Sequence, residues 1–328
     1  MLRRSRRRFL HAALTSAAAV IAARAAGQTA APLRIVVPFP AGGGTDVLAR
    51  IFADRLRAQF PNGVIVDNKV GASGRLGVEA VKNAAPDGLT LLFVPDFLLT
   101  VYPHSFRKLA YDPLRDFTPV AMVARSALVL SAGPALPDSV RSVADFVSWA
   151  KANPKTAFYA TTSAGGTPHF IGVMLARDSG APLSPVHYKG GAPAIQDLLG
   201  GQIPVSVNPV GEILPYARSG RIRVLATTGR QRSKFLPDSP TLAESGFPHI
   251  VVEPWLGWMA PARTPVAAVD RLAQSLGDAA KMPEVIEAAE KIGNEVEFVP
   301  AGRFGKILAQ DIEQWRPVVQ ASGFTAED

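Results

Sequence analysis

Three consecutive glycines followed by a threonine and an aspartate form the stretch of this sequence best suited to bind an anion. The stretch from Pro38 to Asp46 reads PFPAGGGTD and lies between an apolar run, 33–37, and a segment with apolar residues at helical spacing. Glycines leave the backbone free of side chains and let successive N–H groups converge on one point. Thr45 is suited to cap the following helix, whose N-terminus favours negative charge. The stretch therefore predicts a small anion, phosphate or carboxylate, held by backbone N–H groups.

Nucleotides do not fit this loop. A nucleotide P-loop continues with Gly-Lys-Ser/Thr, whereas here Gly44 is followed by Thr45 and Asp46, without a lysine. Asp46 would also repel a polyphosphate, and the third glycine of a dinucleotide fingerprint is missing. Carboxylate is therefore the better candidate. A tight turn in which Asp46 serves only the helix dipole is the alternative that these residues leave open.

A second loop with the same properties occurs in the middle of the chain. Residues 161–169 read TTSAGGTPH and join an apolar run to a helical pattern. Ser163 and Thr167 supply hydroxyls, and His169 supplies a donor. Two such loops that face each other across a cleft would hold a ligand with two acidic ends, or with one acidic and one polar end. Alternatively, the hydroxyls only cap the helix and His169 packs in its first turn.

Residues for covalent or metal chemistry are sparse. Ser163 lacks the Gly-x-Ser-x-Gly elbow, the five histidines show no metal-binding spacing, and the chain has no cysteine. Asp96 directly follows the apolar run 89–94, at the carboxyl end of a predicted strand, where it would reach a ligand cleft or serve as an ordinary helix cap. We therefore expect no catalytic residue, no metal site and no cofactor.

The elements that position both loops follow from the alternation of short apolar runs with helical patterns, which predicts an α/β fold, and the first three strand–helix units imply a parallel sheet. Ligands of such sheets bind at the carboxyl ends of strands, where both glycine loops lie. One α/β unit precedes another, and the last third of the chain returns to the first unit, so that two crossovers form a hinge. We expect one lobe from residues 31–124 and 253–328, and a second from 125–252.

The first thirty residues have the pattern of an export signal. Residues 5–11 read SRRRFLH, which matches the twin-arginine pattern, and an alanine-rich apolar stretch with small residues for cleavage follows. Six arginines precede residue 27, and without them 29 basic residues face 27 acidic ones. The net charge of +8 is therefore no argument for nucleic-acid binding. We expect residues 1–30 to be a cleaved twin-arginine-type signal peptide and the mature protein to lie in the periplasm.

Five motifs, in the same order along the chain, resemble those of the Bug family, the periplasmic solute receptors of tripartite tricarboxylate transporters. They are PFPAGGGTD at 38–46, DNKVGASG at 67–74, APDG at 85–88, DPLRDFTPV at 112–120 and YKGGAPA at 188–194. The resemblance implies a two-lobed periplasmic-binding-protein (Venus flytrap) fold with a ligand cleft between the lobes. It also implies a carboxylated solute: a di- or tricarboxylate, an acidic amino acid or an aromatic acid.

The resemblance carries ligand contacts onto both lobes. In the first lobe they are Phe39, Ala41, Gly43, Thr45 and Asp46; in the second they are Ser163, Thr167, His169, Gly191, Ala192 and Asn208. Two departures from the family pattern stand out. The 163–169 loop is tighter than the usual Ser-x-Gly-x-Gly-Ser/Thr-x-x-His pattern. Asn208 replaces the aspartate of many relatives, which removes a negative charge from the cleft and favours a more acidic ligand.

Two functions are compatible with these residues. The first is an exported, monomeric solute-binding protein that binds a carboxylate without changing it and presents it to a membrane permease or a sensor kinase, with no nucleic acid involved. The second is an exported hydrolase or isomerase of a small organic acid. The enzyme would need a paired acid and base or a nucleophile with its base, and the sequence shows neither. We therefore expect a receptor rather than an enzyme.

Overall fold

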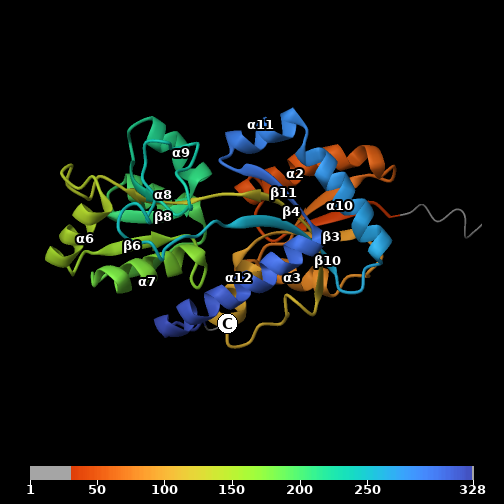
Figure 1. The fold of residues 1–328 in the computed structure, drawn as a ribbon, viewed down its shortest axis with the longest axis horizontal. Helices are drawn as coiled ribbons and strands as arrows, with labels where there is room; N and C mark the ends of the chain where they lie inside the picture. The colour runs from red at the N-terminus through yellow and green to blue at the C-terminus, as the bar shows by residue number, and fades with distance from the viewer. Residues whose placement is uncertain (1–30, 327–328) are drawn as a thin grey trace, which may run out of the picture.

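The computed structural model describes residues 31–326. The predicted signal peptide, residues 1–30, lies outside this range. Two mixed β-sheets with helices around them lie side by side (Figure 1). We call the part of the chain that carries the six-stranded sheet lobe 1 and the part that carries the five-stranded sheet lobe 2. The prediction of a two-lobed α/β fold is confirmed.

The sheet of lobe 1 combines strands from both ends of the chain. Its order is β11 (Glu295–Pro300), β4 (Phe117–Arg125), β10 (Trp255–Pro261), β3 (Thr90–Pro95), β1 (Leu33–Val37) and β2 (Val64–Asn68). Strand β1 runs parallel to β2 and β3, whereas β10 runs antiparallel to β3 and β4. Every residue of β10 is buried, because the strand lies in the middle of the sheet with helices on both faces.

The sheet of lobe 2 is built in the same way. Its order is β7 (Ser184–His187), β6 (Phe158–Thr161), β8 (Val205–Pro209), β5 (Leu128–Ala132) and β9 (Arg223–Thr227). Strands β7, β6 and β8 are parallel, and β5 runs antiparallel to β8 and β9. The parallel pairing predicted for the first three strands is confirmed for β1, β2 and β3, whereas each complete sheet is mixed. The strands that follow each crossover, β5 and β10, enter their sheets antiparallel to their neighbours.

Helices bury both faces of each sheet. They are α2 (Gly44–Leu56), α3 (Arg75–Lys82), α4 (Phe97–Thr100), α5 (Tyr102–Ser105), α6 (Val143–Ala152), α7 (Thr167–Ser179), α8 (Gly191–Leu199), α9 (Val210–Arg218), α10 (Val266–Ala280), α11 (Pro283–Lys291) and α12 (Ala301–Ser322). In lobe 1, α2, α10 and α11 pack on one face, and α3, α4 and α12 on the other. Within residues 31–326, no helix combines the length and the apolar composition that crossing a membrane requires.

Three segments join the lobes. The chain crosses from β4 to β5 and returns from β9 to β10, and α12 adds a third connection. Helix α12 runs from lobe 1 along the lower side of lobe 2 (Figure 1). Its Phe304 and Leu308 lie in the core of lobe 1, whereas Trp315 and Val319 lie in the core of lobe 2. The assignment of residues 31–124, 253–328 and 125–252 to lobes stays a prediction, and α12 contributes to both cores.

Candidate ligand-binding site

The glycine loop of lobe 1 connects the carboxyl end of β1 to α2. Gly43 is the N-cap, with extended backbone, and α2 begins at Gly44. The prediction that Thr45 caps the helix is therefore wrong, because Thr45 already lies inside the first turn. Gly42 has a φ of +84°, which a side chain disfavours, and this turn aims its N–H group at Asp46.

Asp46 holds this loop together from inside. One carboxylate oxygen accepts hydrogen bonds from the Gly42 N–H (2.8 Å) and the Arg50 Nε (2.9 Å), and the other from the Asn68 amide (2.8 Å). The residue is 1% exposed. Burial opposes ionisation of Asp46, but the hydrogen bonds from Arg50, Gly42 and Asn68 outweigh it, so the pKa lies below its usual value. Its predicted contact with a ligand stays a prediction, whereas its bracing of the loop is a function that sequence reasoning missed.

The first turn of α2 presents its backbone N–H groups to solvent. Val47 is the first residue whose N–H bonds back, to the Gly43 carbonyl at 2.9 Å. Within the described residues, the N–H groups of Gly44, Thr45 and Asp46 have no acceptor, as is normal for a helix N-terminus. The backbone from Ala41 to Gly44 is exposed. This arrangement suits a small anion.

Two aromatic rings connect the lobe 1 loop to lobe 2. Phe39 and Phe97 lie 6.2 Å apart between ring centroids, and Phe97 directly follows the end of β3 and Asp96. A Cβ placed on Gly166 of lobe 2 would lie 3.7 Å from the Phe97 ring. The same side of lobe 2 also contacts lobe 1 where the Ser105 hydroxyl donates to the Gly165 carbonyl (3.2 Å). The two loops predicted from the sequence therefore lie on either side of Phe97.

The second loop forms the N-terminus of α7. Gly166 is the N-cap and Thr167 the first helical residue, with its hydroxyl buried and without a hydrogen-bond partner. Gly165 has a φ of +69° and donates its N–H to His169 Nδ1 (3.3 Å). This loop is tied to a third one, since the Gly190 N–H donates to the Thr162 carbonyl (2.9 Å). Ser163, Thr167, Gly191 and Ala192 therefore belong to one group of loops at the carboxyl ends of β6 and β7.

His169 lies on the inner side of this loop. It is 3% exposed and packs against Phe170, His187 and Phe324, the last of which follows α12. Burial, together with the neighbouring His187, lowers the pKa of His169 to about 4. Its Nδ1 accepts from Gly165 and it is neutral near pH 7, so it fixes the turn, as the packing alternative predicts. Direct donation to a ligand stays a prediction.

Asn208 ends β8 beside a carboxylate that sequence reasoning missed. Its amide donates to Glu212 Oε2 (3.0 Å), and its carbonyl oxygen accepts from the Ser206 hydroxyl. The asparagine therefore does not leave this end of the sheet without a carboxyl group, because Glu212 supplies one a helical turn later. The Asn-x-x-x-Glu spacing was the signal available in the sequence.

Asp96 lies at the junction of the lobes. Its backbone N–H donates to the Trp255 carbonyl (3.0 Å), and its Oδ1 atom is buried without a partner. Asp311 of α12 accepts a hydrogen bond from the Trp255 indole (2.8 Å). Burial, and next to it the charge of Asp311, raises the pKa of Asp96 to about 8. Asp96 therefore lies where the sequence predicts it, at the carboxyl end of β3, and is protonated near pH 7.

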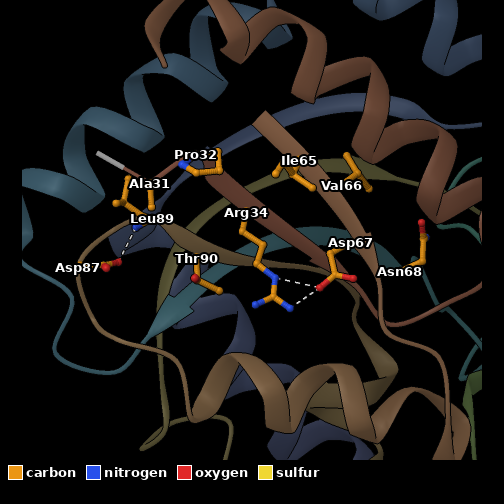
Figure 2. A pocket seen from close by; sticks show the side chains of 10 residues that line it. All are labelled: Ala31, Pro32, Arg34, Ile65, Val66, Asp67, Asn68, Asp87, Leu89 and Thr90. Atoms are coloured by element: carbon orange, nitrogen blue, oxygen red, sulfur yellow. Dashed lines mark hydrogen bonds and ion pairs between the residues drawn. The ribbon is translucent and has the colours of Figure 1, made fainter. Parts of the chain in front are cut away.

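Two pockets lie away from this region. One, of about 510 Å³, lies at the starts of β1 and β3 and beside β2, with the Arg34–Asp67 ion pair on its wall (Figure 2). Another, of about 460 Å³, lies between Tyr111, Ile312 and the connector at 112–115. Neither contains a glycine loop. Among residues 31–326, no group of three histidine, aspartate or glutamate side chains is arranged to hold a metal ion.

Two α/β lobes joined by crossing strands, with glycine loops at the carboxyl ends of their strands, form the fold of a periplasmic binding protein, as in the solved structure of BugD, with a TM-score of 0.81 and 30% identity. The chain belongs to the tripartite tricarboxylate transporter family receptors, whose family model matches residues 48–324. The resemblance to the Bug family is thereby confirmed. The chain is 33% identical to protein BugT of Bordetella pertussis over 310 residues, which cover 94% of each protein.

Solved structures agree with this assignment. An R. palustris protein solved with adipate matches 91% of this chain and 99% of its own, with a TM-score of 0.84 and 30% identity. MatC from Rhodopseudomonas palustris, solved with bound malate, matches 89% of this chain and 99% of its own, with a TM-score of 0.79 and 28% identity. Both relatives are therefore similar over nearly the whole described chain.

Proposed function

We propose that this protein is an exported receptor that binds a small carboxylated solute between its two lobes. The observation that carries the proposal is the first turn of α2, which follows an exposed loop and whose N–H groups at Gly44, Thr45 and Asp46 have no acceptor among the described residues. The adipate and malate bound by two relatives support a carboxylate as the ligand. The buried, unpartnered hydroxyl of Thr167 supports lobe 2 as the second binding surface.

Binding in this proposal needs no covalent step. The carboxylate accepts hydrogen bonds from the α2 N-terminus, whose dipole adds to their strength. The lobes then close over the ligand, and closure is driven only by contacts that the closed state makes better than the open state. Phe97 lies beside both loops. A ligand that touches this ring therefore makes a contact that depends on the positions of both lobes.

The family supports a membrane permease of a tripartite transporter as the receiving partner, and export to the periplasm as the location. Presentation to a sensor kinase stays a prediction. An exported hydrolase or isomerase remains the alternative function. It would convert its acid on incubation, whereas a receptor returns the ligand unchanged.

The direct test removes one N–H group from α2 without removing the helix. Gly44 is the first residue of α2, a position where proline is well tolerated, so Gly44→Pro deletes a donor and keeps the fold. Calorimetry with C4–C6 mono- and dicarboxylates should show binding by the wild type and at least tenfold weaker binding by the variant, since a hydrogen bond to a charged group contributes about 1.5–3 kcal/mol.

Val266→Pro is the matched control, because Val266 is the first residue of α10 and 75% exposed. It should bind like the wild type. Equal affinity of Gly44→Pro and wild type would contradict the assignment of this loop. Chemical conversion of the acid, followed by NMR of the incubated mixture, would favour the enzyme.

A further inference from the structure

Glu212 lies at the end of lobe 2 that meets lobe 1. The residue follows β8 in the first turn of α9, and its neighbour Gly211 packs directly on the Ile292 carbonyl and on Gly293 of lobe 1. A Cβ on Gly191 would collide with the Glu212 carboxylate. Glu212 therefore lies against the first turn of α8, one of the loops to which the family resemblance assigns ligand contacts.

This carboxyl group is held in place and has no cationic partner among residues 31–326. The Ser206 hydroxyl bonds to Asn208, and the Asn208 amide donates to Glu212 Oε2 at 3.0 Å. Within residues 31–326, no lysine, arginine or histidine forms an ion pair with Glu212. Oε1 has no hydrogen-bond partner there and is not fully buried. Burial of the carboxyl raises its pKa, which a cation beside it would reverse.

We propose that Glu212 determines ligand specificity by accepting hydrogen bonds from an ammonium group of the solute. The inference rests on the proposed function: the carboxylate of the solute occupies the α2 N-terminus of lobe 1, and its ammonium group lies at Glu212 in lobe 2. The ligand is then an amino acid with separated charges rather than a dicarboxylate. The second carboxylate of a dicarboxylate would lie beside Glu212 and be repelled by it.

Other carboxylates near the junction do not offer this contact. Both oxygens of Asp46 are already hydrogen-bonded to Gly42, Arg50 and Asn68. Asp311 accepts from the Trp255 indole and, unlike Glu212, already feels the charge of a nearby cation, Arg125. Glu212 combines partial exposure, a fixed position and a free oxygen, and Gly191 is the small residue that makes room for it.

The test compares chain-matched ligands on the mature protein by calorimetry: 4-aminobutanoate with succinate, 5-aminopentanoate with glutarate, and 6-aminohexanoate with adipate. We expect the wild type to bind the amino acid of the best-fitting pair at least tenfold more tightly. Glu212→Gln should weaken amino-acid binding at least tenfold and leave dicarboxylate binding unchanged or stronger. Glu212→Asp keeps the charge and should retain the preference. Glu287→Gln, at an exposed glutamate of α11, should change neither affinity.

Failure of this inference is distinguishable from failure of the proposed function. Tighter binding of dicarboxylates by the wild type, or an unchanged preference in Glu212→Gln, would overturn the role of Glu212 and leave the carboxylate receptor intact. No binding of either series by the wild type would overturn both. If Glu212→Gln does not fold, as its melting curve would show, Glu212→Asp decides: a lost preference for the amino acid overturns the inference, and a retained one supports it.

Discussion

The side-chain amide of Asn68 donates to the Asp46 carboxylate at 2.8 Å and also to the Phe39 carbonyl at 2.9 Å. One residue at the end of β2 thereby ties the beginning of the glycine loop to the helix that follows it. Arg50 completes the arrangement by donating to both Asp46 and Asn68. The exposed N–H groups of α2 are thus fixed before a ligand arrives, which reduces the entropy that binding must overcome.

Replacing Asn68 should therefore weaken binding of every carboxylate to a similar degree. Asn68→Ala removes the two hydrogen bonds that this amide donates and the one that it accepts from Arg50, and it should raise Kd about tenfold and lower the unfolding free energy by about 1–3 kcal/mol. Calorimetry and urea unfolding measure the two effects. Asn83→Ala is the control, since Asn83 closes α3 through its backbone. Unchanged affinity in Asn68→Ala would show that the loop does not need this brace.

The contact between Gly211 and Gly293 predicts a variant that resists closure. A Cβ on either glycine would collide with backbone of the other lobe. Gly211→Ala should therefore hold the lobes apart, lower ligand affinity about tenfold and enlarge the ligand-bound particle in small-angle X-ray scattering. Gly302→Ala has open space around the new methyl group and serves as the control. A wild-type scattering profile and affinity for Gly211→Ala would contradict this prediction.

His169 predicts a loss of stability in acid. Burial and the neighbouring His187 lower its folded pKa to about 4, while the unfolded value is about 6.5. Between pH 4 and pH 6.5 the unfolded state therefore binds more protons than the folded state. The contribution of neutral His169 to the free energy of unfolding is complete above pH 6.5 and is lost as the pH falls to 4. The burial of His187 lowers its pKa in the same sense. Urea unfolding should show a shallower acid loss in His169→Gln than in the wild type; identical slopes would refute the prediction.

Asp96 predicts the opposite dependence. Its folded pKa is raised to about 8, by burial first and by Asp311 second, whereas an unfolded aspartate titrates near 3.9. The stabilising contribution is therefore complete below pH 4 and is lost as pH rises to 8. The nearby guanidinium of Arg125 offsets only part of the rise in the pKa of Asp96. Burial also raises the pKa of Asp311, so its titration changes the stability in the same direction.

Asp96→Asn should remove most of this dependence. Urea unfolding at pH 5 and pH 8.5 should show a smaller loss for the variant than for the wild type. Asp270→Asn, at an exposed position of α10, should behave like the wild type. An equal loss in Asp96→Asn and wild type would mean that other groups carry the dependence.

Much of the fold could be predicted because it depends on local pattern. A strand, a loop and a helix are predicted by the apolar run before Pro38, the three glycines and the helical spacing after them. Each of these elements depends on the types of only a few neighbouring residues. The same holds for the Thr161–His169 loop. The antiparallel insertion of β5 and β10 could not be predicted, because the pairing of strands in a sheet depends on contacts between residues far apart in sequence.

The sequence by itself determined the family, the two glycine loops and their places at the ends of strands, because glycine, proline and small hydroxyl residues act on their own backbone. Only the tertiary structure decided what the charged side chains do. It enclosed Asp46 within its own loop, turned His169 toward Phe324 and placed Glu212 beside Gly191, where no cation of the described residues pairs with it. The charge and pKa of a carboxylate or imidazole depend on burial and on partners from distant segments, which spacing along the chain does not specify.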